Sequence, residues 1–173
     1  MAIPSRRAKP ENIVAGSRTF FITSSTLGKR SLFQSTLAAE LLVKILFEYR
    51  DQGRYRLHEF VVMRDHFHVL LTVGPELSIE RAVQFIKGGF SFRAAKELGL
   101  KGTLWQKGFS EVRVLDEDAY EVEREYVHNN PVRAHMVERA EDYRFSSADP
   151  GYELDAKPQG LKPRFSKDAV RHA

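Results

Sequence analysis

Two apolar segments rich in β-branched and aromatic residues, residues 58–63 and 66–73, are separated only by the polar pair 64–65. Two such runs joined by a short polar turn are typical of a β-hairpin. Successive side chains of a strand point to opposite faces, so His66 and His68 are expected on the same face, about 7 Å apart. The hairpin therefore presents two imidazoles on one face of a sheet while its other face packs on a core.

Two imidazoles on one face of a strand can bind one metal ion. Histidines on strands are also common as surface residues or as hydrogen-bonded core residues, so the pair alone leaves both interpretations open. The chain has no cysteine. Disulfides, thiolate metal sites and cysteine nucleophiles are therefore excluded, and a metal would need nitrogen and oxygen ligands. Such ligands favour a hard or borderline divalent cation.

A chain of 173 residues with 42% hydrophobic content is long enough for one domain with a sizeable core. No segment approaches the roughly 20 apolar residues of a membrane span, and the first residues lack the apolar part of a secretory signal. We therefore expect a cytoplasmic protein without a membrane partner. The 27 Lys and Arg against 23 Asp and Glu give a net charge of +4, which permits a polyanionic partner without requiring one.

The order of the predicted elements is that of a ferredoxin-like split β-α-β sandwich, an α+β fold with an antiparallel sheet, followed by an appended C-terminal helix. The hydrophobic periodicity predicts strands over residues 18–25, 55–63, 66–73 and 111–115, and helices over residues 35–51, 78–98 and 119–130. Gly88-Gly89 is expected to interrupt the second of these helices.

The third helix carries Tyr126 and Asn130 four positions apart, and so on one face. Asp118 and Glu121 have the spacing of a capping box at its start, and Pro131 is expected to end it. Tyr126 and Asn130 each also have a purely structural interpretation, as a tyrosine at the edge of the core and as an asparagine at a helix end. If this face meets the two histidines, however, the amide oxygen supplies a third metal ligand beside a phenol. Tyrosine phenols have a pKa of about 10, so a nucleophilic tyrosine needs help from a metal or a base.

Basic segments are the candidates for contact with nucleic acid. Residues 1–16 form a basic arm, expected to be flexible, that either contacts phosphates or is simply solvated. In residues 87–93, aromatic rings can stack on unpaired bases while cations take phosphates. Alternatively, the rings belong to the core and the two glycines mark a kink or a close contact between helices. Residues 149–173 show no core pattern and are expected to be a flexible tail. The candidate DNA-binding residues are Arg6, Arg7, Lys87, Phe90, Arg93 and Lys107.

Three motifs in this order resemble the single-tyrosine HUH transposases of the IS200/IS605-like class. They are His66-Phe67-His68 after a hairpin, Trp-Gln-Lys-Gly-Phe at residues 105–109, and Tyr-Val-His-Asn-Asn-Pro-Val-Arg-Ala at residues 126–134. The chain looks most like the transposases associated with repetitive extragenic palindromes (REP elements). The resemblance covers residues 17–148, which we expect to form the transposase-like domain.

The resemblance implies a role for each matching residue. His66 and His68 match the metal ligands, Asn130 the third ligand and Tyr126 the nucleophile, with Mg or Mn as the divalent ion. The family cuts single-stranded DNA, forms a 5′-phosphotyrosine link and later rejoins strands, and members of the REP-associated subgroup act on hairpin DNA. From the resemblance to this subgroup we expect a monomer in preference to a homodimer, and a cytoplasmic enzyme associated with the nucleoid. His135 stands where the family often has glycine at the helix end.

Two other functions remain open at the level of sequence. One is a domesticated module that binds DNA hairpins without cutting them. The other is a metal-dependent phosphoesterase in which water attacks and Tyr126 is structural. A covalent adduct between protein and DNA distinguishes the transposase chemistry from both.

Overall fold

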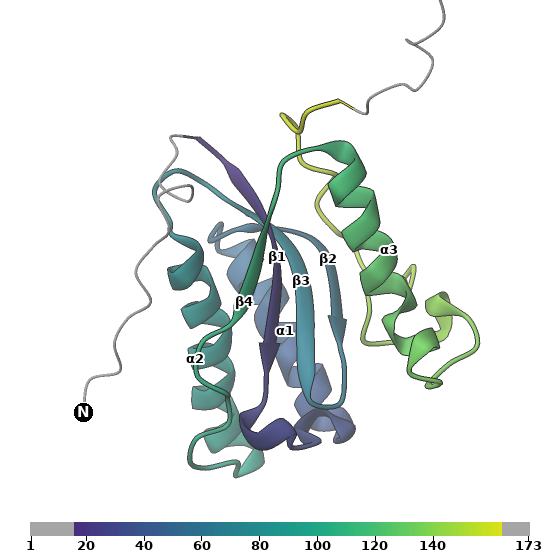
Figure 1. The fold of residues 1–173 in the computed structure, drawn as a ribbon. Coiled ribbons are helices and arrows are strands. Elements are labelled where there is room, and N and C mark those ends of the chain that lie inside the picture. Colours follow the sequence, from purple (N-terminus) through teal and green to yellow (C-terminus); the bar gives the residue numbers. More distant parts are fainter. Residues whose placement is uncertain (1–15, 164–173) are drawn as a thin grey trace, which may run out of the picture.

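The computed structural model describes residues 16–163. Their strands form one antiparallel sheet in the order β2-β3-β1-β4 (Figure 1). This confirms the predicted ferredoxin-like arrangement with an appended helix. The elements in chain order are β1 (Arg18–Ser25), α1 (Thr36–Asp51), β2 (Arg56–Val62), β3 (His66–Val73), α2 (Ile79–Leu98), β4 (Ser110–Val114) and α3 (Glu117–Arg133), with short 3-10 turns at Leu27–Lys29, Leu32–Gln34 and Ala140–Asp142.

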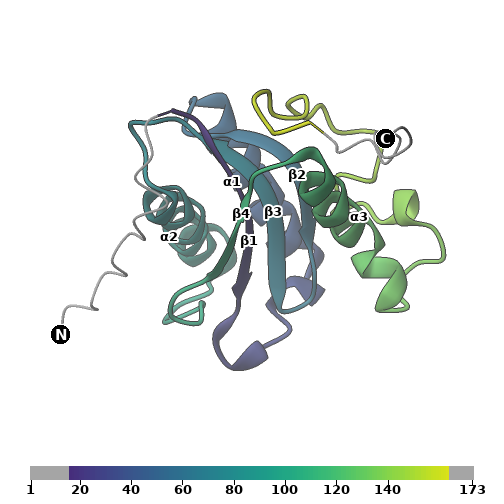
Figure 2. The ribbon, with the colours of Figure 1, turned by 45° about the horizontal axis from the view of Figure 1, so that its top comes forward.

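The sheet is covered on both faces, by α1 and α2 on one side and by α3 on the other (Figures 1 and 2). On β3, alternate residues divide between these layers, because Phe67 and Val69 join the core under α1 and α2 whereas Leu70 joins the smaller cluster under α3. His68 has the same parity as Leu70 and therefore lies on the α3 face. The predicted division of this strand is confirmed.

Strand β2 contains a β-bulge that determines which side chains meet α3. Leu57 pairs with Leu71, but the next pair along the ladder is Glu59 with Leu70, so His58 is the extra residue. As a result Leu57 and Phe60 both enter the core under α1 and α2, while the buried carboxylate of Glu59 lies under α3. Strict alternation along the strand would have separated Leu57 from Phe60.

Helix α2 runs without a break through Gly88-Gly89, so the predicted interruption is wrong. The reason for a small residue is a close contact between helices. A Cβ atom at Gly89 would lie 2.7 Å from the ring and hydroxyl of Tyr49 on α1. Gly89 therefore allows the Tyr49 side chain to pack closely between α1 and α2, and the helix is maintained through the two glycines.

The predicted ends of the third helix were both wrong. Asp116, not Asp118, is the N-cap, and its carboxylate accepts a hydrogen bond from the Ala119 amide at 2.7 Å. At the other end Pro131 lies inside α3, which continues to Arg133. Pro131 is buried, because the last turn of α3 packs against the rest of the domain. The chain then leaves through His135 in a left-handed conformation with φ of 56°, where a glycine would be less strained.

Residues 149–163 pack on the domain instead of forming the predicted flexible tail. Tyr152 stacks on Phe47 of α1 with ring centroids 5.6 Å apart, and the Asp155 carboxylate accepts from the Leu57 amide at 2.8 Å. The domain therefore extends beyond the predicted boundary at residue 148. The basic arm and residues 164–173 lie outside the described residues, apart from Gly16. Among the described helices, none has the length and apolar character needed to cross a bilayer.

His58, the bulge residue, is a buried histidine that links β2 to this C-terminal segment. It is 1% exposed, with Nε2 2.8 Å from Thr72 Oγ1 and Nδ1 3.4 Å from the Asp155 carbonyl oxygen. Burial lowers the pKa of His58 below its ordinary 6.5, outweighing the opposing effects of the nearby Asp155 and Glu59. The native protein therefore holds this ring neutral at a pH where the unfolded chain protonates it.

We expect the free energy of unfolding to decrease as the pH falls below about 6.5, because the unfolded chain then binds protons on two buried histidines, His58 and His68, that the native state does not. The loss reaches at most about 1.4 kcal/mol per pH unit for one histidine. Urea unfolding at about pH 7.5 and about pH 5.5, with a chelator present, measures it. A His58→Gln variant should show a smaller loss, and an equal loss would exclude His58 as a source.

Candidate active site

The two histidines of β3 begin the strand on the face covered by α3. The register of the sheet pairs His66 with Ser25 and His68 with Thr23. The two imidazole rings lie 4.8 Å apart between centroids, and the His68 ring stacks on Phe21 at 5.2 Å. The two rings therefore lie next to each other on one face of the sheet, as the alternation along the strand predicts.

Each histidine ring is held through its Nδ1 atom. His66 Nδ1 lies 2.6 Å from the Asp65 carboxylate, and His68 Nδ1 lies 2.7 Å from Thr23 Oγ1. His68 Nε2 is buried and has no hydrogen-bond partner within residues 16–163. When Nδ1 of each ring donates to its neighbour, the Nε2 lone pair is free to bind a metal, and such second partners are typical of metal-binding histidines. The donor set present here fits a divalent ion.

The His68 ring is neutral under physiological conditions. Burial, together with the nearby His66 and Lys29, lowers the pKa of His68 to about 3. A neutral imidazole is the form that binds a metal, so burial keeps the ligand ready without any need for a proton to leave first.

Tyr126 of α3 lies against His68, the more buried of the two histidines. Its ring centroid is 5.2 Å from that of His68 and 5.9 Å from that of Phe21. On its other side the Arg133 guanidinium lies 5.1 Å from the ring centroid. Helix α3 therefore brings a half-buried phenol to His68 and a cation to that phenol, an arrangement that favours an anionic ligand.

Asn130 lies one turn after Tyr126 on α3 and is half-buried. Within residues 16–163, its side chain makes no hydrogen bond to either histidine, and no three His, Cys, Asp or Glu side chains gather into a metal-binding group. A metal ion held by the two imidazoles would therefore need a third ligand that is not a carboxylate. The side-chain amide oxygen of Asn130, on the same face of α3 as Tyr126, is such a ligand.

A buried network anchors the middle of α3 to the sheet. The Glu59 carboxylate on β2 accepts a hydrogen bond from Ser147 Oγ, lies 2.7 Å from His128 Nε2 and lies 3.2 Å from Arg124 Nε. His128 is two residues beyond Tyr126 and faces Glu59 instead of the two histidines. The network sets where α3 lies on the sheet, and with it the position of Tyr126.

The candidate DNA-binding residues of α2 are engaged inside the protein. Phe90 is fully buried in the core and cannot stack on a base, so that expectation is wrong. Arg93 pairs with Glu48 and Glu97. Lys87 Nζ donates to the carbonyl oxygens of Gln106 at 3.0 Å and Gly108 at 2.8 Å, which fixes the loop of the Trp-Gln-Lys-Gly-Phe motif.

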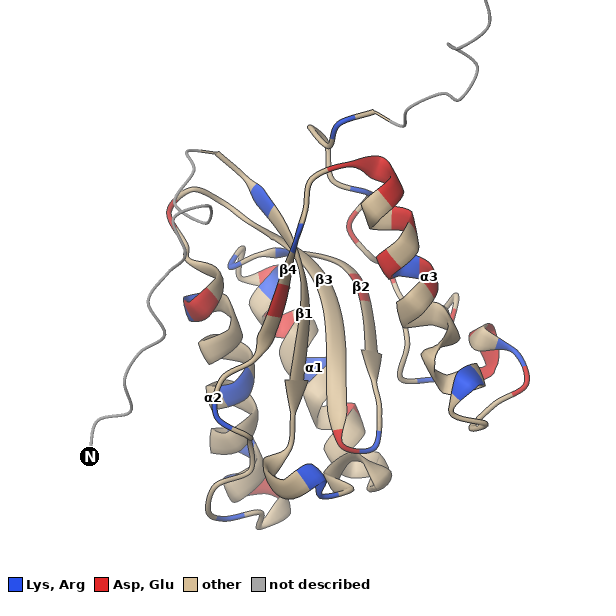
Figure 3. Ribbon diagram, in the orientation of Figure 1, with Lys and Arg blue, Asp and Glu red and all other residues tan. Residues whose placement is uncertain are grey.

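Lys107 is exposed on that loop and remains available to a ligand. Arg6 and Arg7 lie outside the described residues. Figure 3 shows Lys and Arg in the segment after β1, at the end of the sheet where β3 begins, a basic and an acidic residue side by side in the β2–β3 turn, and acidic residues along the first turns of α3. The segment after β1 is therefore the basic part of the end of the sheet that carries the two histidines.

Three residues of this site were not predicted from the sequence. Thr23 holds His68, but only the pairing of β1 with β3 reveals it. Glu59 anchors α3 because the bulge turns it toward that helix. Asp65 is predicted by the sequence only as a turn residue, although its position directly before His66 already indicates a partner for that ring.

Comparisons with known proteins agree with this geometry. The family model described as "Transposase IS200 like" matches residues 21–130, more than half of the chain. The solved structure of a REP-associated tyrosine transposase bound to a REP hairpin superposes with a TM-score of 0.64 at 21% identity, covering 96% of this chain and 99% of that one. A putative transposase from Deinococcus radiodurans R1 superposes with a TM-score of 0.50 at 20% identity, covering 72% and 96%. None of the curated proteins matches this chain.

Proposed function

Because the chain belongs to the IS200-like transposase family, a family of DNA-processing enzymes, we propose that it cuts and rejoins single-stranded DNA through a covalent link to Tyr126. The observation that carries the proposal is the contact of the Tyr126 ring with the His68 ring, at 5.2 Å between centroids. A phenol and an imidazole that come from different elements and meet at one place are positioned to act on the same group.

In this mechanism the phenolic oxygen of Tyr126 attacks the phosphorus of a phosphodiester. The bond from phosphorus to the 3′ oxygen breaks, and that oxygen takes up a proton in place of the one lost by the phenol. The products are a 5′-phosphotyrosine and a free 3′-hydroxyl. The link conserves the energy of the phosphodiester, so a 3′-hydroxyl can later reverse the reaction without a nucleotide cofactor. Arg133, whose guanidinium lies beside the phenol, offsets the negative charge of the phosphate.

We propose that His66, His68 and Asn130 hold a divalent ion, Mg or Mn, at this position. Bound there, the ion supplies Lewis-acid polarisation of the phosphate and stabilises the charge that develops on it. The support from the chain is the buried Nε2 atom of His68, which has no other partner among residues 16–163.

The proposed substrate is a DNA hairpin with single-stranded flanks. A transposase of the same fold was solved bound to a REP hairpin, which makes such DNA the first substrate to test. Lys107 and the basic arm with Arg6 and Arg7 are proposed to contact its phosphates. Because Tyr126 and both histidines of the site belong to one chain, we propose that a monomer is sufficient. Such an enzyme works where the DNA is, with the nucleoid in the cytoplasm.

The test of this function is a denaturing gel after incubation of the protein with labelled hairpin DNA and Mg or Mn. We expect a shifted band of protein joined to DNA, absent when a chelator is present. Cleavage without such a band would replace the tyrosine mechanism with attack by water. Tight binding without cleavage, over a library of hairpins with randomised flanks, would instead favour a module that only binds.

Metal binding is testable apart from activity. In the chelated protein, adding Mn should raise the free energy of unfolding, by about 2.7 kcal/mol when free Mn is 100-fold above its Kd. His66→Ala should remove most of this increment, because it deletes a proposed ligand. The increment is measured within each variant, with and without Mn, so any packing lost with this side chain, which is 23% exposed, affects both states alike. The matched control is His135→Asn, since His135 is exposed and asparagine tolerates its positive φ. An equal Mn effect in wild type and His66→Ala would exclude His66 as a ligand.

A further inference from the structure

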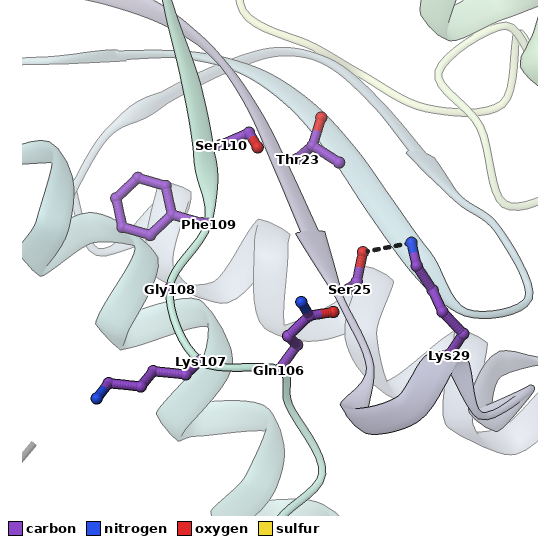
Figure 4. Close-up of a pocket in the computed structure, with 8 residues that line it drawn as sticks. All are labelled: Thr23, Ser25, Lys29, Gln106, Lys107, Gly108, Phe109 and Ser110. Atoms are coloured by element: carbon purple, nitrogen blue, oxygen red, sulfur yellow. Dashed lines mark hydrogen bonds between the residues drawn. The ribbon is translucent and has the colours of Figure 1, made fainter.

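A polar pocket opens beside the two histidines, and the proposed chemistry does not use it. Its volume is about 290 Å³, and it lies between the end of β1 and the loop that leads into β4 (Figure 4). The residues that line it are Thr23, Ser25, Lys29, Gln106, Lys107, Gly108, Phe109 and Ser110.

The register of the sheet connects this pocket to the metal-binding histidines. Thr23 pairs with His68 on one side and with Ser110 on the other, so these three side chains form a row on the same face of the sheet. Ser25 likewise pairs with His66. Thr23 belongs to both places, because it lines the pocket while its Oγ1 lies 2.7 Å from His68 Nδ1. The pocket therefore continues the active site across the sheet toward β4.

The chemistry of the lining suits an anion with polar edges. No carboxylate lines the pocket, and neither Lys29 nor Lys107 forms an ion pair with an acidic side chain among residues 16–163. The Lys29 ammonium donates to Ser25 Oγ at 3.0 Å, as Figure 4 shows, and keeps its charge for a further acceptor. Gln106 offers an amide with both donor and acceptor, as used in reading the edge of a base.

The wall formed by residues 105–109 is held rigidly. Lys87 Nζ donates to the carbonyl oxygens of Gln106 and Gly108, and Trp105 Nε1 donates in return to the Lys87 carbonyl oxygen at 3.0 Å. The backbone N–H of Gln106 also donates to the Ser25 carbonyl oxygen at 2.9 Å, and Gly108 takes a left-handed φ of 78°. Because its backbone is fixed in this way, Gln106 holds its place before any ligand arrives.

We propose that this pocket binds one nucleotide of the single strand next to the phosphate that Tyr126 attacks, with Lys29 on the phosphate and Gln106 on the base edge. The inference rests on the proposed function and adds to it a residue that determines specificity. The volume of about 290 Å³ is close to the lower limit of roughly 300 Å³ for small-ligand sites, which suits one nucleotide. An unpaired nucleotide has its base edge free for Gln106, so the pocket is assigned to the flank of a hairpin and not to its paired stem.

The test uses the full chain and a library of DNA hairpins with randomised single-stranded flanks. Strands joined covalently to the protein are isolated under denaturing conditions and sequenced. We expect wild type to prefer one base at a flank position near the cut, and Gln106→Ala to weaken that preference about tenfold while leaving other positions unchanged. Gln34→Ala, an exposed glutamine outside the pocket, is the matched control and should keep the wild-type profile.

A second variant addresses the phosphate contact. Lys29 has a φ of 56°, so Lys29→Asn removes the charge at a position whose conformation asparagine tolerates. Its adduct yield should fall about tenfold for all flank sequences alike, since a phosphate contact carries no sequence information.

The possible results separate the two proposals. Wild-type adducts together with an unchanged base profile in Gln106→Ala would overturn the nucleotide pocket and leave the tyrosine mechanism intact. Failure of the wild type to form an adduct with any member of the library would overturn the proposed function, and the pocket assignment with it. Thermal unfolding of each variant, expected to match wild type because both side chains are exposed, checks that the fold is retained.

Discussion

A Tyr126→Phe variant should bind hairpin DNA as tightly as wild type and form no covalent adduct with it. The substitution removes only the hydroxyl, which is the proposed nucleophile. Phenylalanine keeps the ring contacts with Phe21 and His68, so the position of α3 is retained. Removal of a nucleophile reduces the rate by about 10³-fold or more. The denaturing gel with labelled DNA and Mn measures adduct formation, and a native gel measures binding.

The matched control is Tyr152→Phe, which also removes one hydroxyl. Tyr152 donates to the Arg144 carbonyl oxygen and packs on Phe47 and Phe60, in the layer under α1 and α2. It should form adducts at the wild-type rate. A covalent adduct in Tyr126→Phe would show that another residue is the nucleophile and would end the proposed mechanism.

A Glu59→Gln variant should be less stable than wild type by about 2 kcal/mol and should form adducts about tenfold more slowly. Glu59 is 7% exposed, and its carboxylate is shared by His128, Arg124 and Ser147. A neutral amide cannot balance the Arg124 charge, and its NH₂ group faces donors. Because these contacts hold α3 two residues from Tyr126, their loss moves the nucleophile as well as weakening the fold.

Urea unfolding measures the stability of this variant, and single-turnover kinetics at saturating DNA measures the adduct rate. The control is Glu40→Gln, whose ion pair with Arg144 lies at the surface with 43% and 61% of the side chains exposed. Such pairs contribute less than about 1 kcal/mol, so the control should unfold and react like wild type. If Glu59→Gln lost stability but kept its adduct rate, the network would be structural without positioning Tyr126.

Local pattern was sufficient for much of the candidate site. The alternation along β3 placed His66 and His68 together on the face away from the α1 and α2 core, and helical spacing placed Tyr126 and Asn130 on one face of α3. These are properties of a single element, whose geometry follows from its own backbone. The roles of these residues came from resemblance and remain proposals, with Asn130 the least supported by contacts.

Several predictions failed where packing overrode a local preference. Pro131 disfavours a helix before it, yet α3 continues because a buried turn is gained. Gly88-Gly89 has low helix propensity, yet α2 is unbroken because Gly89 allows the approach of Tyr49. Residues 149–163 have little apolar content, but Tyr152 and Asp155 attach them to the domain. Each outcome depends on a partner distant in the sequence.

For this protein, residue order alone defines the hairpin, the helices and the chemistry their side chains carry, because periodicity and residue type act within one segment. The site itself depends on contacts between segments. Thr23 reaches His68 only through the register of β1 and β3, and Glu59 meets His128 only because a bulge in β2 turns it under α3. Register and bulges are selected by the burial of the whole sheet between two helical layers. The free energy of that burial comes from all the segments together, so no single segment determines it.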